Sequence, residues 1–330
     1  MISNSKIDKI GEALKGSSEL SGTNYQELLK WRNSFEPTLD YYFNKLKTRV
    51  DEKNRASLAR RLKRIESIQI KLKRFKSMRL STLQDIAGVR CVLKDVEELD
   101  ATYELLRGLK TKHILKRLDD YQSKPKEDGY RGIHLVYQSE KSKMIEIQLR
   151  TELQHTWATA VEIYGELQNT SFKTGGGDKL WREFFQLLSS VFAYKEQRIP
   201  LIQHLGLTEK QIKRKLIALM DRLNVIERLN ASTNNLDVIV EKYNSSGKAG
   251  KYALLELDLL GNQTRIEIFN KKDVAKAIEI YTYKELTSKD TNIVFVNIED
   301  LENIRKSYPN YFMDTRNLLE ILSKIKLGDF

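Results

Sequence analysis

The middle of the chain, about residues 58–165, alternates between short apolar segments of strand character and segments whose apolar residues repeat at helical spacing. The polar turn Glu140–Ser142 separates two strand-like runs and predicts an antiparallel hairpin. This part of the chain is therefore predicted to combine a β-sheet with helices. The predicted strands are Ala87–Leu93, His113–Leu118, about 131–139 and about 143–150.

Helical spacing also marks residues 5–48, and Thr208 is predicted to cap a helix that continues to about Leu229. Gly175–Gly177 predicts a flexible loop, because no lysine-serine pair follows it as a phosphate-binding loop requires. Ala231–Asn235 predicts a polar linker, after which strand character dominates. The strands predicted there are Leu236–Tyr243, Lys251–Leu260, Gln263–Phe269 and Ile293–Val296, with a turn at Gly261–Asn262, a helix through Val274 and Tyr281, and a last helix through Leu318 and Ile325.

These patterns divide the chain into four predicted segments. The 330 residues exceed one ordinary domain and suit two. The segments are N-terminal helices (1–50), a central α+β domain (51–200), a connecting helix (201–232) and a small C-terminal α+β domain (233–330).

Composition limits the compartment and the partners. No apolar stretch approaches the length of a membrane span, and the N-terminus lacks the apolar core of a signal peptide. A single cysteine, Cys91, excludes an internal disulfide framework and is predicted to be buried in a strand. We expect a cytoplasmic protein that makes no use of a membrane. The net charge of +12 favours an anionic partner such as a nucleotide or tRNA.

Basic residues are concentrated between Arg60 and Arg79, where Glu66 is the one acidic residue. Such a run is often the solvated face of a helix. Here it leads into an apolar strand with carboxylates nearby, which makes a phosphate-binding role equally plausible on the residues alone.

The predicted strand from Met144 to Arg150 carries an unusual polar face. Side chains alternate along a strand, so Glu146, Gln148 and Arg150 share one side. His134 on the preceding strand is predicted to join them. Solvent-exposed strand faces usually carry threonine and lysine, so this combination favours a functional site over a plain solvated face.

Asp85 stands immediately before the strand Ala87–Leu93. A lone aspartate in that position often caps a turn. The alternative is that Asp85 and Glu146 converge on Mg²⁺, since hard divalent ions prefer carboxylate oxygens and keep positions free for phosphate. Spacing alone leaves both interpretations open.

The segment from Lys124 to Arg131 has the composition of a turn with two lysines beside a tyrosine predicted to be exposed, Tyr130. A tyrosine ring offers a flat face to a nucleobase, and lysines offer charges to phosphates. A plain surface turn is the simpler interpretation of this segment by itself.

Taken together and in order, these segments resemble the synthetase domain of the RelA/SpoT family. The resemblance covers roughly residues 55–165 and extends through the Leu153-Gln154-His155 segment. Several ordered motifs are far more specific than any one of them. The motifs are Arg61-x-Lys63-x-x-x-Ser67-Ile68-x-x-Lys71, Asp85-Ile-Ala-Gly-Val-Arg90, Pro125-Lys126-x-Asp128-Gly129-Tyr130-x-x-x-His134 and Glu146-Ile-Gln148-Leu-Arg150-Thr151.

The resemblance implies a mixed β-sheet flanked by helices, related to nucleotidyltransferases. It also implies transfer of the β,γ-pyrophosphate of ATP to a 3′-hydroxyl, with release of AMP and with Mg²⁺ as cofactor. The residues before position 50 are too few for the hydrolase domain of long family members, so we expect synthesis without degradation.

Residue roles follow from the same resemblance. Asp85 and Glu146 would hold Mg²⁺, and Glu146 would also activate the attacking hydroxyl. Ser67 would cap a helix between the phosphate-binding lysines. The residues implied for ATP are Arg61, Lys63, Ser67, Lys71 and Arg90, and those implied for the acceptor are Lys124, Lys126, Asp128, Tyr130, His134, Gln148, Arg150, His155 and Glu162.

Two departures from the family pattern fall on the acceptor side. Asp128 replaces the usual asparagine before Gly-Tyr, which adds negative charge where a guanine nucleotide brings more. Thr159 stands where long members have a glutamate, and Glu162 shares a helical face with His155 and Thr159 and is predicted to substitute.

Three functions therefore stay open on the sequence. The first is synthesis of (p)ppGpp from ATP and GTP or GDP. The second is a toxin that pyrophosphorylates the 3′ CCA end of tRNA. The third is a regulator that binds nucleotide or RNA without catalysis, against which Asp85 and Glu146 argue. The C-terminal domain is predicted to inhibit, to sense a protein trigger or to mediate assembly, and homo-oligomerisation is not readable from the sequence.

Overall fold

The computed structural model describes residues 2–16, 21–50, 56–167, 178–234, 237–242, 252–258, 260–261, 263–287, 291–297, 304–305 and 308–330. The predicted loop Gly175–Gly177 and the second residue of the predicted turn, Asn262, lie outside these ranges.

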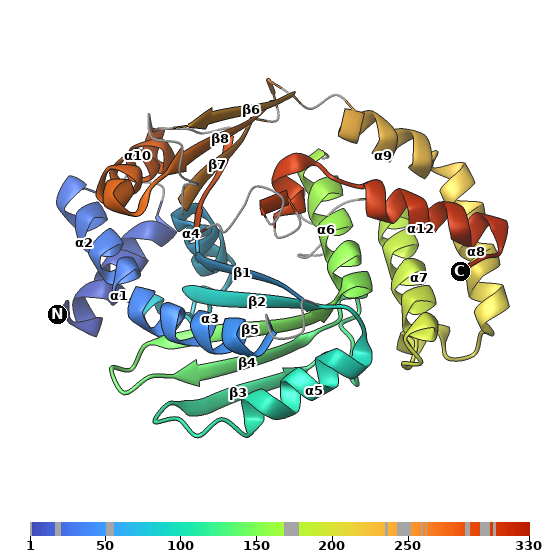
Figure 1. The fold of residues 1–330 in the computed structure, drawn as a ribbon, viewed down its shortest axis with the longest axis horizontal. Helices are drawn as coiled ribbons and strands as arrows, with labels where there is room; N and C mark the ends of the chain where they lie inside the picture. Colours follow the sequence, from blue (N-terminus) through green and yellow to red (C-terminus); the bar gives the residue numbers. More distant parts are fainter. Residues whose placement is uncertain are drawn as a thin grey trace.

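A mixed five-stranded sheet forms the centre of the first half of the chain (Figure 1). Its strand order is β1-β2-β5-β4-β3; β2 and β5 run parallel, and the other neighbours are antiparallel. The predicted strands and the predicted hairpin are confirmed. The strands are β1 (Ala56–Leu62), β2 (Ala87–Leu93), β3 (Ile114–Asp120), β4 (Ile133–Gln138) and β5 (Met144–Thr151).

The first of these strands, β1, was not predicted. Arg60 and Arg61 belong to it, so the basic run begins on a strand and not on a helix. The run then enters helix α4, whose last turn carries Lys71, Lys73 and Arg74. The two arginines hid the strand because strand prediction relies on apolar and β-branched residues.

The two faces of this sheet differ in character. One face packs against the N-terminal helices and α5 in an apolar core that includes Leu39, Tyr42, Val89 and Ile147. Buried Cys91 lies on this face, as predicted. The helices here are α1 (Asn4–Lys15), α2 (Gly22–Asn33), α3 (Glu36–Val50), α4 (Ile65–Arg74) and α5 (Val96–Arg107). The opposite face carries the polar side chains of β5.

A second core joins four helices that follow the sheet to the last helix of the chain. These are α6 (Glu152–Leu167), α7 (Lys179–Lys195), α8 (Glu209–Arg222), α9 (Val225–Asn234) and α12 (Arg316–Leu327). Thr208 caps α8 in a capping box with Gln211, as predicted.

The single connecting helix predicted here is wrong, because the chain breaks between α8 and α9 at Asn224. Asn224 has a left-handed backbone with φ 48°, a conformation in which asparagine is enriched. The linker predicted at Ala231–Asn235 is also wrong as far as Asn234, because helix α9 continues to that residue.

A second sheet occupies the C-terminal part, with strand order β6-β8-β7-β9. The predicted strands and helix are confirmed as β6 (Asp237–Lys242), β7 (Tyr252–Asp258), β8 (Gln263–Phe269), β9 (Thr291–Asn297) and α10 (Val274–Thr287). Short 3₁₀ turns lie at η2 (Leu80–Thr82), η4 (Ile202–His204), η5 (Lys271–Asp273) and η6 (Pro309–Phe312).

This C-terminal part, called here the C-terminal module (β6 to η6), lies beside β1 and α4 of the first half (Figure 1). A buried ion pair links the two parts, between Arg32 on α2 and Glu285 on α10, with Nη1 to Oε2 at 3.0 Å. The chain then leaves the module, and α12 packs in the second core and not on the second sheet. Within the described residues, no helix is long and apolar enough to cross a membrane.

Candidate active site

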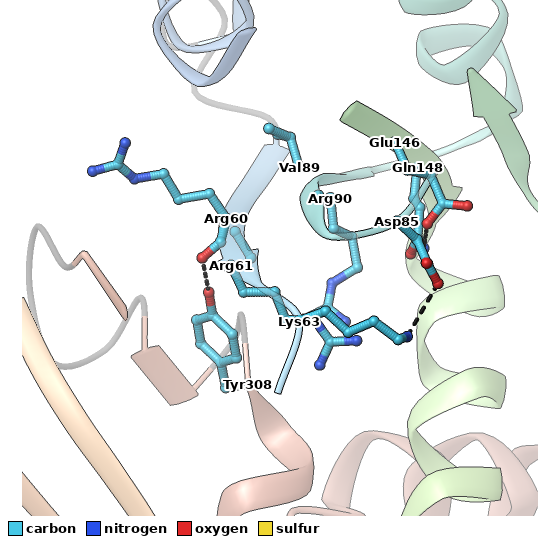
Figure 2. A pocket seen from close by; sticks show the side chains of 11 residues that line it. Arg60, Arg61, Lys63, Asp85, Val89, Arg90, Glu146, Gln148 and Tyr308 are labelled. Carbon is cyan, nitrogen blue, oxygen red and sulfur yellow. Dashed lines mark hydrogen bonds and ion pairs between the residues drawn. The ribbon is translucent and has the colours of Figure 1, made fainter. Parts of the chain in front are cut away.

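A pocket opens on the polar face of the first sheet, at the β1 side (Figure 2). Strands β1, β2 and β5 and the turn before β2 supply most of its wall, and the C-terminal module supplies Tyr308. The residues that line it are Ala59, Arg60, Arg61, Lys63, Asp85, Gly88, Val89, Arg90, Glu146, Gln148 and Tyr308.

Strand register explains why residues distant in sequence meet there. Gly88 pairs with Arg61 on one side and with Glu146 on the other, so no side chain stands between them. Two residues along, Arg90 pairs with Gln148, and Gln148 pairs with His134 on β4. Residues directly opposite one another in neighbouring strands share a face. The predicted convergence of His134, Glu146 and Gln148 on one face is therefore confirmed.

Asp85 lies at the mouth of β2 between two lysines. Its Oδ2 accepts hydrogen bonds from Lys63 Nζ at 3.0 Å and Lys71 Nζ at 2.8 Å. Burial alone would raise the pKa of Asp85, but the two ammonium groups hold it below its ordinary value. Burial lowers the pKa of Lys63 despite this pairing. The Asp85 carboxylate is therefore ionised and already in contact with residues predicted for phosphate.

Glu146 is held in place by polar neighbours on its own sheet face. Its Oε1 accepts from His134 Nδ1 at 3.0 Å, and its Oε2 accepts from Gln148 Nε2 at 2.6 Å. Burial raises the pKa of this carboxyl, yet the bonds to His134 and Gln148 prevail and lower it to about 2. His134 Nε2 is in turn hydrogen bonded to the Tyr130 hydroxyl at 2.5 Å.

The two carboxylates fit a magnesium ion. Asp85 Oδ1 is buried and has no hydrogen-bond partner among the described residues, so one oxygen is available to a cation. Glu146 raises the pKa of Asp85, which shows that the two charges act on each other. No group of three metal-ligating side chains exists in the described ranges. Mg²⁺ is usually bound by one or two carboxylates together with substrate phosphates and water, and Asp85 and Glu146 are two carboxylates that line one pocket.

Arg90 lines the pocket and is partly buried, and loss of solvent and the neighbouring Arg150 lower its pKa to about 10. Its guanidinium carbon lies 5.8 Å from the centre of the Tyr308 ring. The Tyr308 hydroxyl donates to the Arg60 carbonyl at 2.8 Å (Figure 2). A tyrosine of the C-terminal module therefore occupies the side of the pocket that the resemblance assigns to ATP.

Ser67 does not cap a helix, contrary to the prediction. Helix α4 begins at Ile65, its N-cap is Arg64, and no side chain of the N-cap forms a capping bond. Ser67 stands at the third position of the helix. The first N–H of α4 is instead satisfied by Glu285, whose Oε1 accepts from Ile65 N at 2.7 Å. The sequence could not reveal this cap because it comes from another part of the chain.

The loop between β3 and β4 contains the predicted acceptor residues, and it corrects one expectation. Tyr130 is buried, with 7% of its surface exposed, so the exposed tyrosine predicted there is wrong. Its hydroxyl also accepts from Arg150 Nε at 3.2 Å. Asp128 Oδ1 accepts from Tyr130 N at 2.8 Å and so shapes the turn.

Gly129 in the same loop has φ 102°, and a Cβ atom there would lie 2.9 Å from both Ser189 and Trp157. Only glycine fits that position. Lys126 places its ammonium 4.5 Å from the ring centre of Tyr121 and 5.0 Å from that of Tyr130. Lys124 is exposed at the start of the loop.

The remaining predicted residues lie on α6, which follows β5 directly. His155 is buried there, with 9% of its surface exposed. Glu162 raises the pKa of Arg90, so its charge acts on a residue predicted for ATP. The acceptor roles of His155 and Glu162 stay predictions.

Two parts of the site were not predicted from the sequence. Tyr308 was missed because nothing in its own segment marks it, and only the packing of the module brings it to Arg90. Arg117, Asp119 and Tyr121 were missed although their alternate spacing was visible, since they continue the polar face of the sheet onto its free edge.

Comparison with known proteins agrees with this geometry. Residues 60–167 match the family model described as "Region found in RelA / SpoT proteins". This part of the chain therefore carries the region that RelA/SpoT proteins share. The matched residues include β1, α4, β2, the acceptor loop and β5, and so contain both carboxylates.

Individual relatives match over part of their length. A GTP pyrophosphokinase of Photobacterium angustum is 30% identical over 175 residues, which is 52% of this chain and 23% of that protein. GTP pyrophosphokinase YjbM of Bacillus subtilis is 37% identical over 109 residues, which is 30% of this chain and 51% of that protein. The chain thus spans about a quarter to a half of these relatives.

Among solved structures, small alarmone synthetase 1 of Bacillus subtilis bound to its product pppGpp is 24% identical. The alignment covers 51% of this chain and 93% of that one, with a TM-score of 0.43.

Proposed function

We propose that this protein transfers the β,γ-pyrophosphate of ATP to the 3′-hydroxyl of GTP or GDP. The observation that carries the proposal is the position of Asp85 and Glu146, which line one pocket together with a set of cations. The cations that line this pocket are Arg60, Arg61, Lys63 and Arg90. Lys71 contacts Asp85 from α4.

The geometry suits this reaction because pyrophosphate transfer depends on positioning and charge neutralisation more than on covalent chemistry. The acceptor 3′-oxygen bonds to the β-phosphorus, the bond from that phosphorus to the bridging α-phosphate oxygen breaks, and AMP leaves with the bridging oxygen. Glu146, held by His134 and Gln148, faces the hydroxyl and takes its proton as the oxygen becomes acidic. Bound Mg²⁺, held by Asp85 and Glu146, would neutralise charge on the phosphates.

The relatives favour a guanine nucleotide as acceptor, because the two compared above are named GTP pyrophosphokinase. A second acceptor, the 3′ end of tRNA, is favoured by the net charge of +12 and by the acidic Asp128 in the acceptor loop. A tRNA-modifying enzyme loses tRNA affinity steeply as salt rises, because phosphate contacts release counterions. Absence of tRNA binding at low salt would exclude this second acceptor.

We further propose that the C-terminal module inhibits the enzyme by covering the donor side of the pocket. Tyr308 is 5% exposed and lies against Arg90, a residue that a nucleotide bound in the pocket would also contact. A protein partner that displaces the module would then activate the enzyme. Deleting the module is a poor test, because the chain returns from it to place α12 in the second core. Point variants of the full chain are the better experiment.

The direct test is transfer of label from ATP carrying a labelled γ-phosphate, with Mg²⁺ and with GTP, GDP or deacylated tRNA added separately. The variant Asp85→Ala/Glu146→Gln is the blank. Label on GTP or GDP supports the proposal, and label on tRNA alone supports the second acceptor. If neither wild type nor Tyr308→Ala transfers label to any acceptor, the proposed function is wrong and a non-catalytic regulator is favoured.

A further inference from the structure

A second cavity, of about 460 Å³, lies where the segment between α5 and β3 meets α3 and the β4–β5 hairpin. Its volume is that of a small-molecule site. It is separate from the catalytic pocket: the two share no lining residue, and Tyr42, which bonds to His113 of this cavity, belongs to the apolar core on the other face of the sheet. The residues that line the second cavity are Tyr41, Lys110, Thr111, Lys112, His113 and Glu140.

Thr111 contributes a hydroxyl whose two acceptor positions are already occupied. Its Oγ1 accepts from the Tyr41 hydroxyl at 3.1 Å and from His113 N at 3.2 Å. A hydroxyl has two lone pairs and one proton. The proton of Thr111 has no acceptor among the described residues, so it is available to a ligand.

His113 contributes a second donor. Its Nδ1 lies 3.2 Å from the hydroxyl of Tyr42, which is 0% exposed. Burial raises the pKa of Tyr42, so the hydroxyl keeps its proton and donates it to Nδ1. Burial also lowers the pKa of His113, although Glu140 opposes this shift, and the ring is therefore neutral near pH 7. A neutral ring that accepts at Nδ1 carries its own proton on Nε2.

The charges at the rim are mainly positive. Lys110 and Lys112 are exposed, and Lys45 places its Nζ 5.9 Å from the centre of the Tyr41 ring. Lys112 pairs with Glu140 at 3.8 Å, but their side chains are 82% and 65% exposed, so this pair is weak and readily exchanged. Glu140 is the one acidic residue of the lining. Donors and positive charge therefore dominate this cavity.

We propose that the second cavity binds the phosphate group of a small molecule. The Thr111 hydroxyl, His113 Nε2–H and the ammonium groups of Lys110 and Lys112 donate to its oxygens, and Lys112 leaves Glu140 to do so. A phosphate dianion offers oxygen acceptors and negative charge only, which matches a set of donors. Its source is inorganic phosphate or a mononucleotide, whose remaining atoms would lie against the Tyr41 ring. The inference does not depend on the proposed reaction.

Histidine NMR of the full chain tests this, because the chain has four histidines and each can be assigned by its own His→Gln variant. The probes are inorganic phosphate and, separately, UMP, whose base is neither that of the proposed donor nor that of either acceptor. Sodium chloride of equal ionic strength is the reference. The His113 signal is expected to move and to approach saturation by about 10 mM phosphate, where a ligand with a millimolar Kd is mostly bound.

Variants of exposed residues give effects of opposite sign. Lys110→Gln/Lys112→Gln is expected to weaken phosphate binding by about tenfold or more, because two charge-assisted donors are lost. Glu140→Gln is expected to tighten it by about threefold, because an opposing charge is removed. The matched control is Lys116→Gln, an exposed lysine of β3 outside the lining, with binding expected within twofold of wild type. The thermal midpoint is expected to stay at its wild-type value in all three.

Tighter binding of UMP than of phosphate identifies a mononucleotide as the ligand, and equal binding identifies the free ion. A His113 signal that moves with neither probe overturns the inference. So does a signal that moves equally with chloride, or equally in the double lysine variant and wild type. Weaker binding in Glu140→Gln would also contradict a site for an anion.

Discussion

The part of the site assigned to ATP, called here the donor half, and the part assigned to the acceptor, called the acceptor half, lie on one sheet face. They differ in which residues contact their polar groups. On the donor half, around β1 and β2, Arg90 meets Tyr308 of the C-terminal module, and the first N–H of α4 meets Glu285 of the same module. On the acceptor half, around β4 and β3, the polar groups bond one another: Tyr130 bonds His134, and His134 bonds Glu146.

This difference shows where regulation can act. The hydrogen bonds of the acceptor half link β4, β5 and the loop before β4, and α7 packs against that loop through Ser189. The donor half is covered by residues more than 200 positions away, and the proposed inhibition requires those residues to separate from it. Four predictions test or sharpen the comparison.

The largest effect is expected where the two halves meet. The double variant Asp85→Ala/Glu146→Gln removes both carboxylates and is expected to lower kcat by roughly 10⁴-fold. Binding of the ATP analogue without Mg²⁺ is expected to change far less. Steady-state label transfer measures the first effect and calorimetry the second. A residual kcat within tenfold of wild type would mean that neither carboxylate serves the reaction.

The second effect concerns the link that holds the module beside the donor half. Arg32→Leu leaves Glu285 as an unpaired buried charge, which is expected to cost about 4 kcal/mol in the free energy of unfolding. Urea unfolding measures it. The matched control is Arg107→Ala, whose pair with Glu104 is exposed and is expected to contribute about 0.5 kcal/mol or less. An equal cost for both variants would contradict a structural role for the buried pair.

The third effect is the acid sensitivity of the acceptor half. The pKa of Glu146 is about 2 in the folded chain and 4.5 when unperturbed. The resulting stabilisation is complete above pH 4.5 and is lost as the pH falls toward 2, because the unfolded state binds the proton first. The loss is expected to be about 3 kcal/mol, and Glu146→Gln removes this dependence. The measurement is the fraction unfolded of wild type and Glu146→Gln at a fixed urea concentration as the pH is lowered. The same pH dependence in both proteins would contradict this prediction.

The smallest effect separates the two halves directly. Tyr308→Ala uncovers the donor half and is expected to tighten apparent ATP affinity by about tenfold, since the binding-competent fraction rises. Acceptor affinity is expected to stay unchanged, because the acceptor half does not contact Tyr308. Tyr308→Phe, which loses only the bond to the Arg60 carbonyl, should fall between. Unchanged ATP affinity in Tyr308→Ala would show that the module does not cover the donor site.

Much of the site was predictable because its spacing is local. Glu146 and Gln148 share a face by strand alternation, and the hairpin brings His134 beside them through the pairing of β4 with β5. The same alternation was visible in Arg117, Asp119 and Tyr121, but their strand has no continuous apolar face to draw attention to it. Ser67 and Tyr130 were misplaced because helix capping and burial depend on neighbours from elsewhere in the chain.

The sequence by itself determined most of the elements, the polar face of the central sheet and the match of residues 60–167 to the region found in RelA/SpoT proteins. Those properties arise from residues close in sequence, whose spacing is set by backbone geometry. Only the tertiary structure decided that Glu285 caps α4, that Tyr308 stands against Arg90, that Tyr130 is buried and that α12 leaves the C-terminal module. Each of these depends on contacts between distant segments, and such contacts leave no periodic pattern in either segment alone.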